Sequence, residues 1–327
     1  MAKLTVTLPV YNGMPFVKDA VESVLRQTYT DFRFLIIDDG SSDGTADYLK
    51  SLSDPRLRVI LRENQGLGNT LNQLFSESET EYVARMDSDD VCAPDRIKTV
   101  MAFLESNTDI VMVGCDQAFL VGSKTMNAAP RPTDHESIRR QLLIKRPGIL
   151  HPTIVVRREA WERAGGYRLS GAGEDLDFCL RMCDVGRVAN IPAVLYYYRL
   201  HATSLSNSRR QEINFGYDYG VACALARERG ENEPELKAYR QRWESRPIAA
   251  RTAARLGDLG QRFYRLSLVR RLEGRRFVSA AFMLGAAAVQ PQTAADHVMK
   301  AASRLFRQRH DKILLRTPPA VGDPKFE

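Results

Sequence analysis

The sequence predicts an α/β protein with a mostly parallel central sheet flanked by helices, followed by a helical extension at the carboxyl end. Strand-like and helix-like segments alternate over the first 115 residues, an order that requires right-handed crossovers between parallel strands. The segment 32–37 is continuously apolar after Arg33, which is typical of a strand buried on both faces. From Phe215 onward the chain shows only helical patterns, which are interrupted at Pro234, Pro247 and Pro291.

The individual elements follow from the periodicity of apolar residues. Strands are expected at 4–8, 32–37, 57–61, 81–86 and 110–113. Helices are expected at 15–26, 45–52 and 68–78, and a further helix opens at Pro94, because proline suits the first turn. The stretch 116–152 is expected to be irregular around one helix at 135–144. After it we expect a strand at 153–157, a helix at 173–182 and a strand at 188–200.

Charge divides the chain into two zones. The 327 residues carry a net charge of +7, and the hydrophobic fraction of 44% is ordinary for a globular protein. The first 215 residues hold 26 basic and 28 acidic side chains, whereas the remainder holds 21 basic and 12 acidic ones. An acidic zone that carries the carboxylate motifs is therefore followed by an arginine-rich zone.

Three features predict a cytoplasmic protein. Lys3 is followed by a strand and not by the apolar segment of a signal peptide. The longest apolar stretch, 277–289, is shorter than the roughly 20 residues that span a bilayer. The five cysteines form no C-x-x-C pair, and their scatter fits reduced thiols.

An acidic cluster directly follows the strand-like run 81–86. Asp87, Asp89 and Asp90 would lie at the rim of the sheet, where hard oxygen ligands can hold a cation that bridges two phosphates. Clustered carboxylates raise each other's pKa, so the arrangement is costly unless a cation or basic groups neutralise it. A calcium loop of the EF-hand type is excluded because its sixth position, which needs glycine, is Cys92. A solvated acidic turn is the alternative.

A second acidic strand end lies upstream. Asp38 and Asp39 end the second strand, and the first strand contributes Pro9 and Tyr11 to the same carboxyl edge. An aromatic ring, a carboxylate that accepts from a base N–H and a nearby cation site together suit a nucleoside diphosphate. The alternative for Asp39 is a turn residue, a position that aspartate serves well.

Seven short runs resemble the family 2 glycosyltransferases, which have the GT-A fold. They lie at 5–12, 36–44, 63–66, 84–96, 165–168, 173–181 and 198–201. Their order and spacing match over about the first 210 residues, and nothing comparable covers the last third. The resemblance implies a Rossmann-like GT-A domain that uses a nucleotide-sugar donor, most plausibly a UDP-sugar.

The resemblance implies donor-binding roles for residues at the edge of the sheet. Tyr11 and Asp39 would contact the nucleobase, and Pro9 would shape that pocket. Glu63 and Asn64 would line the nucleotide cleft.

The resemblance also implies the metal site and the catalytic base. Asp87 and Asp89 would form the D-x-D motif, whose metal is Mn²⁺ or Mg²⁺, and His201 would meet the metal or the diphosphate. Asp175 would deprotonate the acceptor hydroxyl, and single displacement would invert the anomeric configuration. Two alternatives remain: Glu174 and Asp175 could simply favour the start of a helix, and His201 could be an ordinary surface or core histidine.

Two other function classes are weighed against a glycosyltransferase. A nucleotidyltransferase would place a basic glycine-rich loop near the first strand, but 9–15 holds one glycine and no basic residue. A nucleic-acid-binding protein is suggested by the pI of about 9.2, but the arginine-rich third lacks interleaved aromatic residues. We therefore expect no nucleic-acid partner.

The expected domains are a catalytic domain at 1–215, a basic helical region at 216–316 and a disordered tail at 317–327. Basic helices with an apolar stripe, as in 259–272, can lie on an anionic membrane surface. That contact, at the inner face of the membrane, would suit a lipid-linked or other carbohydrate acceptor in surface polysaccharide or glycolipid assembly. Alternatively, the stripe packs on the catalytic domain or on a second subunit of a homo-oligomer.

Overall fold

The computed structural model describes residues 2–169, 173–201 and 210–289, which belong to two compact units. The first unit comprises Met1–Ala118, Asn127–Arg199 and Gln211–Tyr239, and the second comprises Phe119–Met126, Leu200–Arg210 and Arg240–Glu327. The tail predicted at 317–327 lies outside the described residues, and the domain boundaries inferred from the sequence stay predictions.

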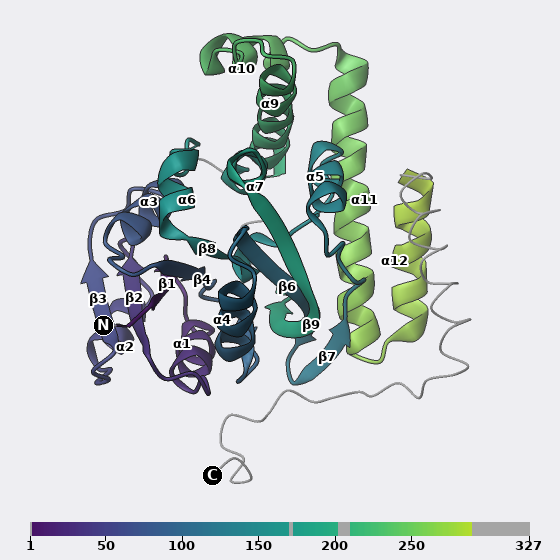
Figure 1. The fold of residues 1–327 in the computed structure, drawn as a ribbon. Helices are drawn as coiled ribbons and strands as arrows, with labels where there is room; N and C mark the ends of the chain where they lie inside the picture. The colour runs from purple at the N-terminus through teal and green to yellow at the C-terminus, as the bar shows by residue number, and fades with distance from the viewer. Residues whose placement is uncertain (1, 170–172, 202–209, 290–327) are drawn as a thin grey trace. The chain divides into compact units, whose positions relative to one another are not determined.

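The described strands form one nine-stranded sheet (Figure 1). Its order is β3-β2-β1-β4-β8-β6-β9-β5, with β7 paired to β6. The strands are β1 (Leu4–Val10), β2 (Phe32–Asp38), β3 (Leu57–Leu61), β4 (Tyr82–Arg85), β5 (Val91–Cys92), β6 (Ile110–Val121), β7 (Lys124–Asn127), β8 (Val155–Arg157) and β9 (Arg187–Arg199). The first four strands run parallel, whereas β8 runs antiparallel to both β4 and β6.

Helices alternate with these strands and then replace them. The helices are α1 (Val17–Leu25), α2 (Thr45–Lys50), α3 (Leu67–Ser76), α4 (Arg96–Ser106), α5 (His135–Leu143), α6 (Arg158–Ala164), α7 (Glu174–Val185), α9 (Arg210–Glu228), α10 (Leu236–Glu244), α11 (Ile248–Leu272) and α12 (Arg276–Val289). None of those helices combines the length and the apolar character needed to cross a membrane.

Two apolar layers cover the parallel part of the sheet. Val6 and Leu8 of β1 pack with the buried faces of α1 and α4. Leu35 and Ile37 of β2 point to the other face, where they pack with Leu74 of α3. Every residue of β1 is buried, as expected of a central strand with helices on both faces. The predicted α/β fold is confirmed.

One prediction about secondary structure is wrong, and two short elements were not predicted. The strand expected to end at 113 continues as β6 to Val121 and turns back as β7, so an irregular segment from 116 onward is wrong there. Gly122 makes the turn with φ +57°, a conformation that glycine adopts without strain. The helix α6 was not predicted. The two-residue strand β5 was not predicted either, since a strand this short forms only through pairing with a distant partner, here β9.

A buried ionic network anchors α7 to the segment before it. Asp177 is fully buried, and its carboxylate pairs with Arg168 at 2.5 Å and with Arg181 at 2.9 Å. Arg181 also donates to the backbone carbonyls of Ala164 and Gly166. Because these bonds hold the glycine turn against the first half of α7, they fix the helix whose first residues carry the predicted base.

We expect Asp177→Asn to lower the free energy of unfolding by about 3 kcal/mol, because two arginines would lose their buried countercharge. Urea denaturation followed by circular dichroism measures this change. Asp47→Asn is the matched control, since the Asp47 side chain is 87% exposed and lies 4.0 Å from Lys50. Equal stability of the two variants would contradict an anchoring role for Asp177.

Candidate active site

The carboxyl ends of β1, β2 and β4 meet at one edge of the sheet. Val10 lies opposite Asp38 in the register between β1 and β2, and Thr7 lies opposite Arg85 in the register between β1 and β4. The residues that follow each strand, Tyr11 among them, therefore project from neighbouring positions. Parallel pairing thus brings the predicted nucleobase residues and the D-x-D loop to the same edge.

Asp39 is held by donors from the segment after β3. Arg62 donates through Nε to Asp39 Oδ1 at 2.9 Å and pairs ionically with the same oxygen, 2.8 Å from a terminal nitrogen. Gln65 N–H also donates to Oδ1, at 3.0 Å. Gly66 N–H donates to Oδ2 at 2.8 Å. A carboxylate has about four acceptor positions, so Oδ1 is crowded whereas Oδ2 retains room for one further donor. The Asp39 carboxylate can therefore accept one further hydrogen bond from a bound molecule, through Oδ2.

The other predicted donor-binding residues surround this carboxylate. The Tyr11 side chain is 54% exposed, and Pro9 lies buried in β1. Glu63 and Asn64 are exposed in the loop after β3. A Cβ added to Gly40, whose φ is +85°, would lie 2.9 Å from the Asn64 backbone nitrogen, so only glycine lets the two loops approach this closely.

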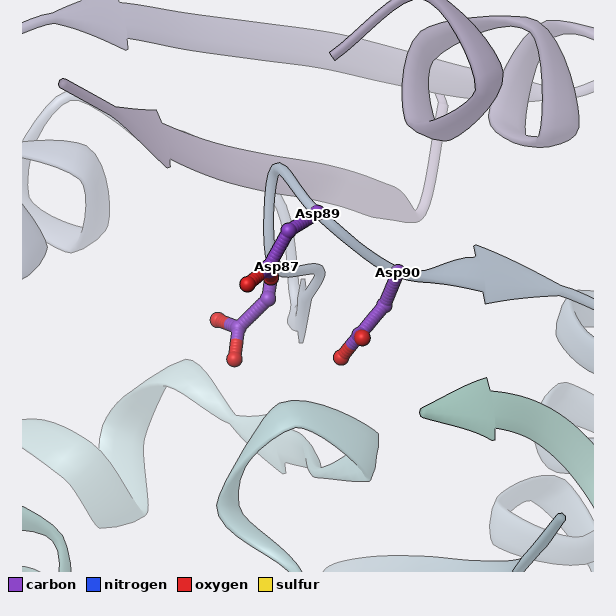
Figure 2. A group of neighbouring side chains, drawn as sticks. All are labelled: Asp87, Asp89 and Asp90. Atoms are coloured by element: carbon purple, nitrogen blue, oxygen red, sulfur yellow. The ribbon is translucent and has the colours of Figure 1, made fainter. Parts of the chain in front are cut away.

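The D-x-D loop gathers three carboxylates, one more than the motif itself contains. One oxygen each from Asp87, Asp89 and Asp90 lies within 4.8 Å of the others (Figure 2). Asp90 is fully buried, and its Oδ2 has no hydrogen-bond donor in the described part of the chain. The sequence places Asp90 in the acidic cluster, but the resemblance assigns the metal to Asp87, Asp89 and His201. Oxygen ligands this close together can converge on one hard cation.

The pKa values in the loop show how poorly these negative charges are compensated. Burial, together with the neighbouring Asp89 and Asp175, raises the pKa of Asp87 to about 6 against the lowering effect of Arg85. Burial and the two neighbouring carboxylates raise the pKa of Asp90 well above its ordinary value. A divalent cation would relieve both costs, so the buried Asp90 oxygen and the converging ligands fit a metal site.

Strand β9 holds the D-x-D loop in place. Arg199, at the end of β9, donates through Nε to the Asp89 carbonyl at 2.7 Å and through its backbone N–H to Asp90 Oδ1 at 2.8 Å. The same guanidinium donates to Asp19 of α1 at 2.7 Å. Asp87 N–H donates to the Tyr196 hydroxyl at 3.2 Å. The sequence resemblance included Arg199 in a matching run but assigned it no role.

Asp175 lies at the start of α7, close enough to the loop to interact electrostatically with Asp87. Burial raises the pKa of Asp175, while the Tyr217 hydroxyl, which donates to Oδ2 at 3.0 Å, lowers it. Burial and the neighbouring Asp175 raise the pKa of Glu174 to about 8. Tyr217 comes from α9, in the region where the sequence resemblance ends, and could not be identified from the motifs.

Arg85 is the buried cation of this site. It pairs with Asp87 at 2.7 Å and is 4% exposed. Burial is the largest single effect and opposes its charge, but Asp87 and further neighbours, Glu174 among them, together outweigh burial and raise the pKa of Arg85. Behind it, burial and Arg85 lower the pKa of His151, whose Nε2 lies 2.8 Å from the Tyr167 hydroxyl. A lone arginine at the end of an apolar strand was the available sequence signal, and we missed it.

His201, the third predicted metal ligand, belongs to the second unit. Its side chain is partly exposed. Its role as a ligand stays a prediction.

Comparisons with known proteins identify relatives of this chain. Residues 5–165 match the family model described as "Glycosyl transferase family 2". A Bacillus subtilis protein named "Putative glycosyltransferase EpsE" is 30% identical over 67% of this chain and 80% of its own length. The O-antigen biosynthesis glycosyltransferase WbnJ of Escherichia coli is 28% identical over 63% of this chain and 82% of its own length.

Solved structures share the fold. The S. aureus TarS structure (residues 1–349) in complex with UDP-GlcNAc superposes with a TM-score of 0.61 at 16% identity, covering 89% of this chain and 92% of TarS. The mannosyltransferase PcManGT from Pyrobaculum calidifontis, in complex with GDP-Man and Mn²⁺, gives a TM-score of 0.52 at 18% identity and covers 93% and 80% of the two chains. The predicted GT-A fold is confirmed.

The fold and the matching relatives define a glycosyltransferase. The chain belongs to glycosyltransferase family 2. Membership in this family favours sugar transfer over the nucleotidyltransferase and nucleic-acid-binding alternatives.

We expect Arg199→Lys to weaken Mn²⁺ binding by about tenfold, because lysine keeps the charge but cannot bond the Asp89 carbonyl and Asp19 together. Isothermal titration with Mn²⁺ measures the change. Arg187→Lys is the matched control, since Arg187 begins the same strand and pairs with Asp109 in an exposed position. Unchanged Mn²⁺ affinity in Arg199→Lys would show that the loop holds its shape without this contact.

Proposed function

We propose that this glycosyltransferase moves a sugar from a UDP donor to an acceptor hydroxyl with inversion, with the help of Mn²⁺ or Mg²⁺. The observation that carries the proposal is the convergence of the three loop carboxylates, within 4.8 Å, at a site where Asp87 and Asp175 interact. The three loop carboxylates suit a cation on the diphosphate, and Asp175 suits proton removal from an acceptor.

Asp87, Asp89 and Asp90 would hold the cation, and His201 is retained as a further candidate ligand. A bound divalent cation would neutralise negative charge on the leaving diphosphate. Arg199 holds the loop through the Asp89 carbonyl, so it acts as a positioning residue.

Asp175 would take the proton from the acceptor hydroxyl while that oxygen attacks the anomeric carbon. The Tyr217 hydroxyl donates to Asp175 Oδ2, which orients the carboxylate. Because burial raises the pKa of Asp175, the carboxylate is a stronger base than an exposed aspartate. Direct attack by the acceptor, with no enzyme nucleophile involved, inverts the anomeric centre.

The hydrogen bonds of Asp39 support uracil as the donor base. Uracil presents a single ring N–H, which matches the one open acceptor position on Asp39 Oδ2. Guanine presents adjacent ring and amino donors, which would need both carboxylate oxygens, but Oδ1 already accepts from Arg62 and Gln65. The exposed Tyr11 ring can stack on the base from the neighbouring strand end.

The acceptor is proposed to be a carbohydrate or a lipid-linked sugar, used in surface polysaccharide or glycolipid assembly. Similarity to an O-antigen biosynthesis enzyme supports this class. Such a reaction would proceed in the cytoplasm at the inner face of the membrane, with peripheral membrane contact and with homo-oligomer formation as a further possibility. The proposed catalytic domain is 1–215, and 216–316 is the proposed basic helical region.

We expect the protein to hydrolyse UDP-sugars in the presence of Mn²⁺ and to leave GDP-sugars intact. EDTA should abolish the reaction, added Mn²⁺ should restore it, and Asp89→Ala should eliminate it while circular dichroism shows an unchanged fold. Mass spectrometry of a donor panel measures the products. Full activity in EDTA would exclude the metal role, and turnover of GDP-sugars alone would exclude the uracil assignment.

We expect Asp175→Asn to reduce turnover by about 100-fold or more, because the amide is nearly isosteric but cannot take a proton. Since burial raises the pKa of Asp175, the wild-type rate should fall with decreasing pH at values above the ordinary aspartate pKa of about 3.9. Transfer assays at a series of pH values measure both the loss of turnover in the variant and the pH dependence of the wild type.

The affinity for UDP should remain unchanged in Asp175→Asn, since the base faces the acceptor. Asp184→Asn, at the other end of α7, is the matched control and should keep wild-type turnover. A parallel loss of UDP affinity and rate would make Asp175 a binding residue instead of the base.

A further inference from the structure

The second unit contains a helical hairpin made of α11 and α12, which lie side by side (Figure 1). The rings of Phe263 and Phe282 lie 6.0 Å apart between the two helices, and the Ser279 hydroxyl donates to the Ser267 carbonyl at 2.8 Å. A Cβ added to Gly285 would approach the Phe263 ring to 3.1 Å. Small residues thus let the helices pack closely, and the inner face of α12 is already occupied.

The outer face of α12 carries large apolar side chains in the open. Phe277 is 94% exposed and Leu284 is 71% exposed. Ala281 and Ala288 are exposed as well, and the spacing of these four residues, with steps of four, three and four, places them on one stripe of the helix. Val278 adds a neighbouring side chain that is 43% exposed. An apolar stripe of this kind is normally covered by protein or lipid.

Arginines surround the end of the hairpin from which this stripe begins. Arg271, Arg275 and Arg276 are exposed at the turn, immediately before Phe277. Over residues 248–289 the chain has eight arginines and two acidic residues, which leaves a charge of +6. The two acids are already partnered: Glu273 pairs with Arg270 at 2.7 Å, and Asp258 lies 3.3 Å from the Arg210 side chain. The exposed apolar stripe therefore begins beside three exposed arginines, in a hairpin of net charge +6.

We propose that the turn of this hairpin and the stripe of Phe277 and Leu284 bind the anionic headgroup surface of a lipid bilayer. Phenylalanine and leucine would enter the boundary between headgroups and acyl chains, while the arginines at the turn would meet the lipid phosphates. A second copy of the chain is the poorer occupant, because facing two surfaces of charge +6 would add electrostatic repulsion to the contact. Charge complementarity thus selects the lipid.

The binding surface deepens the proposed function, since a lipid-linked acceptor would reside in the same bilayer. The biological purpose of the membrane contact rests on the proposed function. The contact itself needs neither donor nor metal. Vesicle binding and UDP-sugar hydrolysis can therefore fail independently of each other. Phe277 and Leu284 belong to the second unit and to none of the residues assigned to metal, donor or base.

The test is sedimentation of the full-length protein with vesicles of phosphatidylcholine alone or with added phosphatidylglycerol, at low and high salt. The wild type should sediment with anionic vesicles at low salt and be released at high salt. Phe277→Ser/Leu284→Ser and Arg275→Gln/Arg276→Gln should each reduce partitioning by about tenfold. All variants should hydrolyse UDP-sugars at the wild-type rate if the proposed transferase activity is present.

Two matched controls separate this surface from general stickiness and charge. Ile144→Ser removes a 54% exposed apolar side chain from the first unit, and Arg33→Gln/Arg58→Gln removes two exposed positive charges from it. Both controls should bind anionic vesicles like the wild type. The proposal is overturned if the hairpin variants sediment as well as the wild type, or if the wild type stays in the supernatant throughout. It is also overturned if light scattering shows a dimer that Phe277→Ser/Leu284→Ser dissolves, since the stripe would then face a second copy.

Discussion

Repulsion among buried carboxylates is the constraint on which the rest of the site depends. Asp87, Asp90, Glu174 and Asp175 all have raised pKa values, and Arg85 is the buried cation that interacts with most of them. Arg85 and the buried Arg96 lower the pKa of Asp87 without restoring its ordinary value, so some carboxylates must carry protons or a divalent cation must bind. So costly an arrangement is expected where a ligand supplies positive charge. A metal ion bound with a diphosphate donor would supply that charge.

Much of the surrounding fold can be understood as a means of holding these groups against their repulsion. Tyr196 and Arg199 bond the D-x-D loop from β9, and Tyr217 bonds Asp175 from α9. Asp177 and its two arginines anchor α7, the helix that carries Asp175. The close approach of α9 to α7 requires Gly173, where a Cβ would lie 2.8 Å from the Ile213 carbonyl. The contacts that hold the site thus come from several elements, and most of these partners are distant from it in sequence.

The two units have opposite electrostatic characters, as the uneven charge of the sequence suggested. The first unit presents carboxylates at the edge of a sheet, whereas the hairpin of the second presents arginines around exposed apolar residues. The apolar stripe recognised in the sequence at 259–272 proved to be divided: Leu268 and Leu272 are buried, while Leu259 and Leu266 remain 39% exposed. Helical spacing alone could not separate these two faces, because both are apolar.

The sequence by itself determined the α/β order, the parallel edge and the family, because these depend on local periodicity and on short runs adjacent along the chain. Pro9, Tyr11, Asp39 and the D-x-D residues could be placed at one edge for that reason. Only the tertiary structure decided that an oxygen of the buried Asp90 converges with those of Asp87 and Asp89, and that Arg199, 109 residues away, bonds Asp90. The same holds for Arg85 and Tyr217, whose positions depend on long-range packing that leaves no periodic signal in the chain.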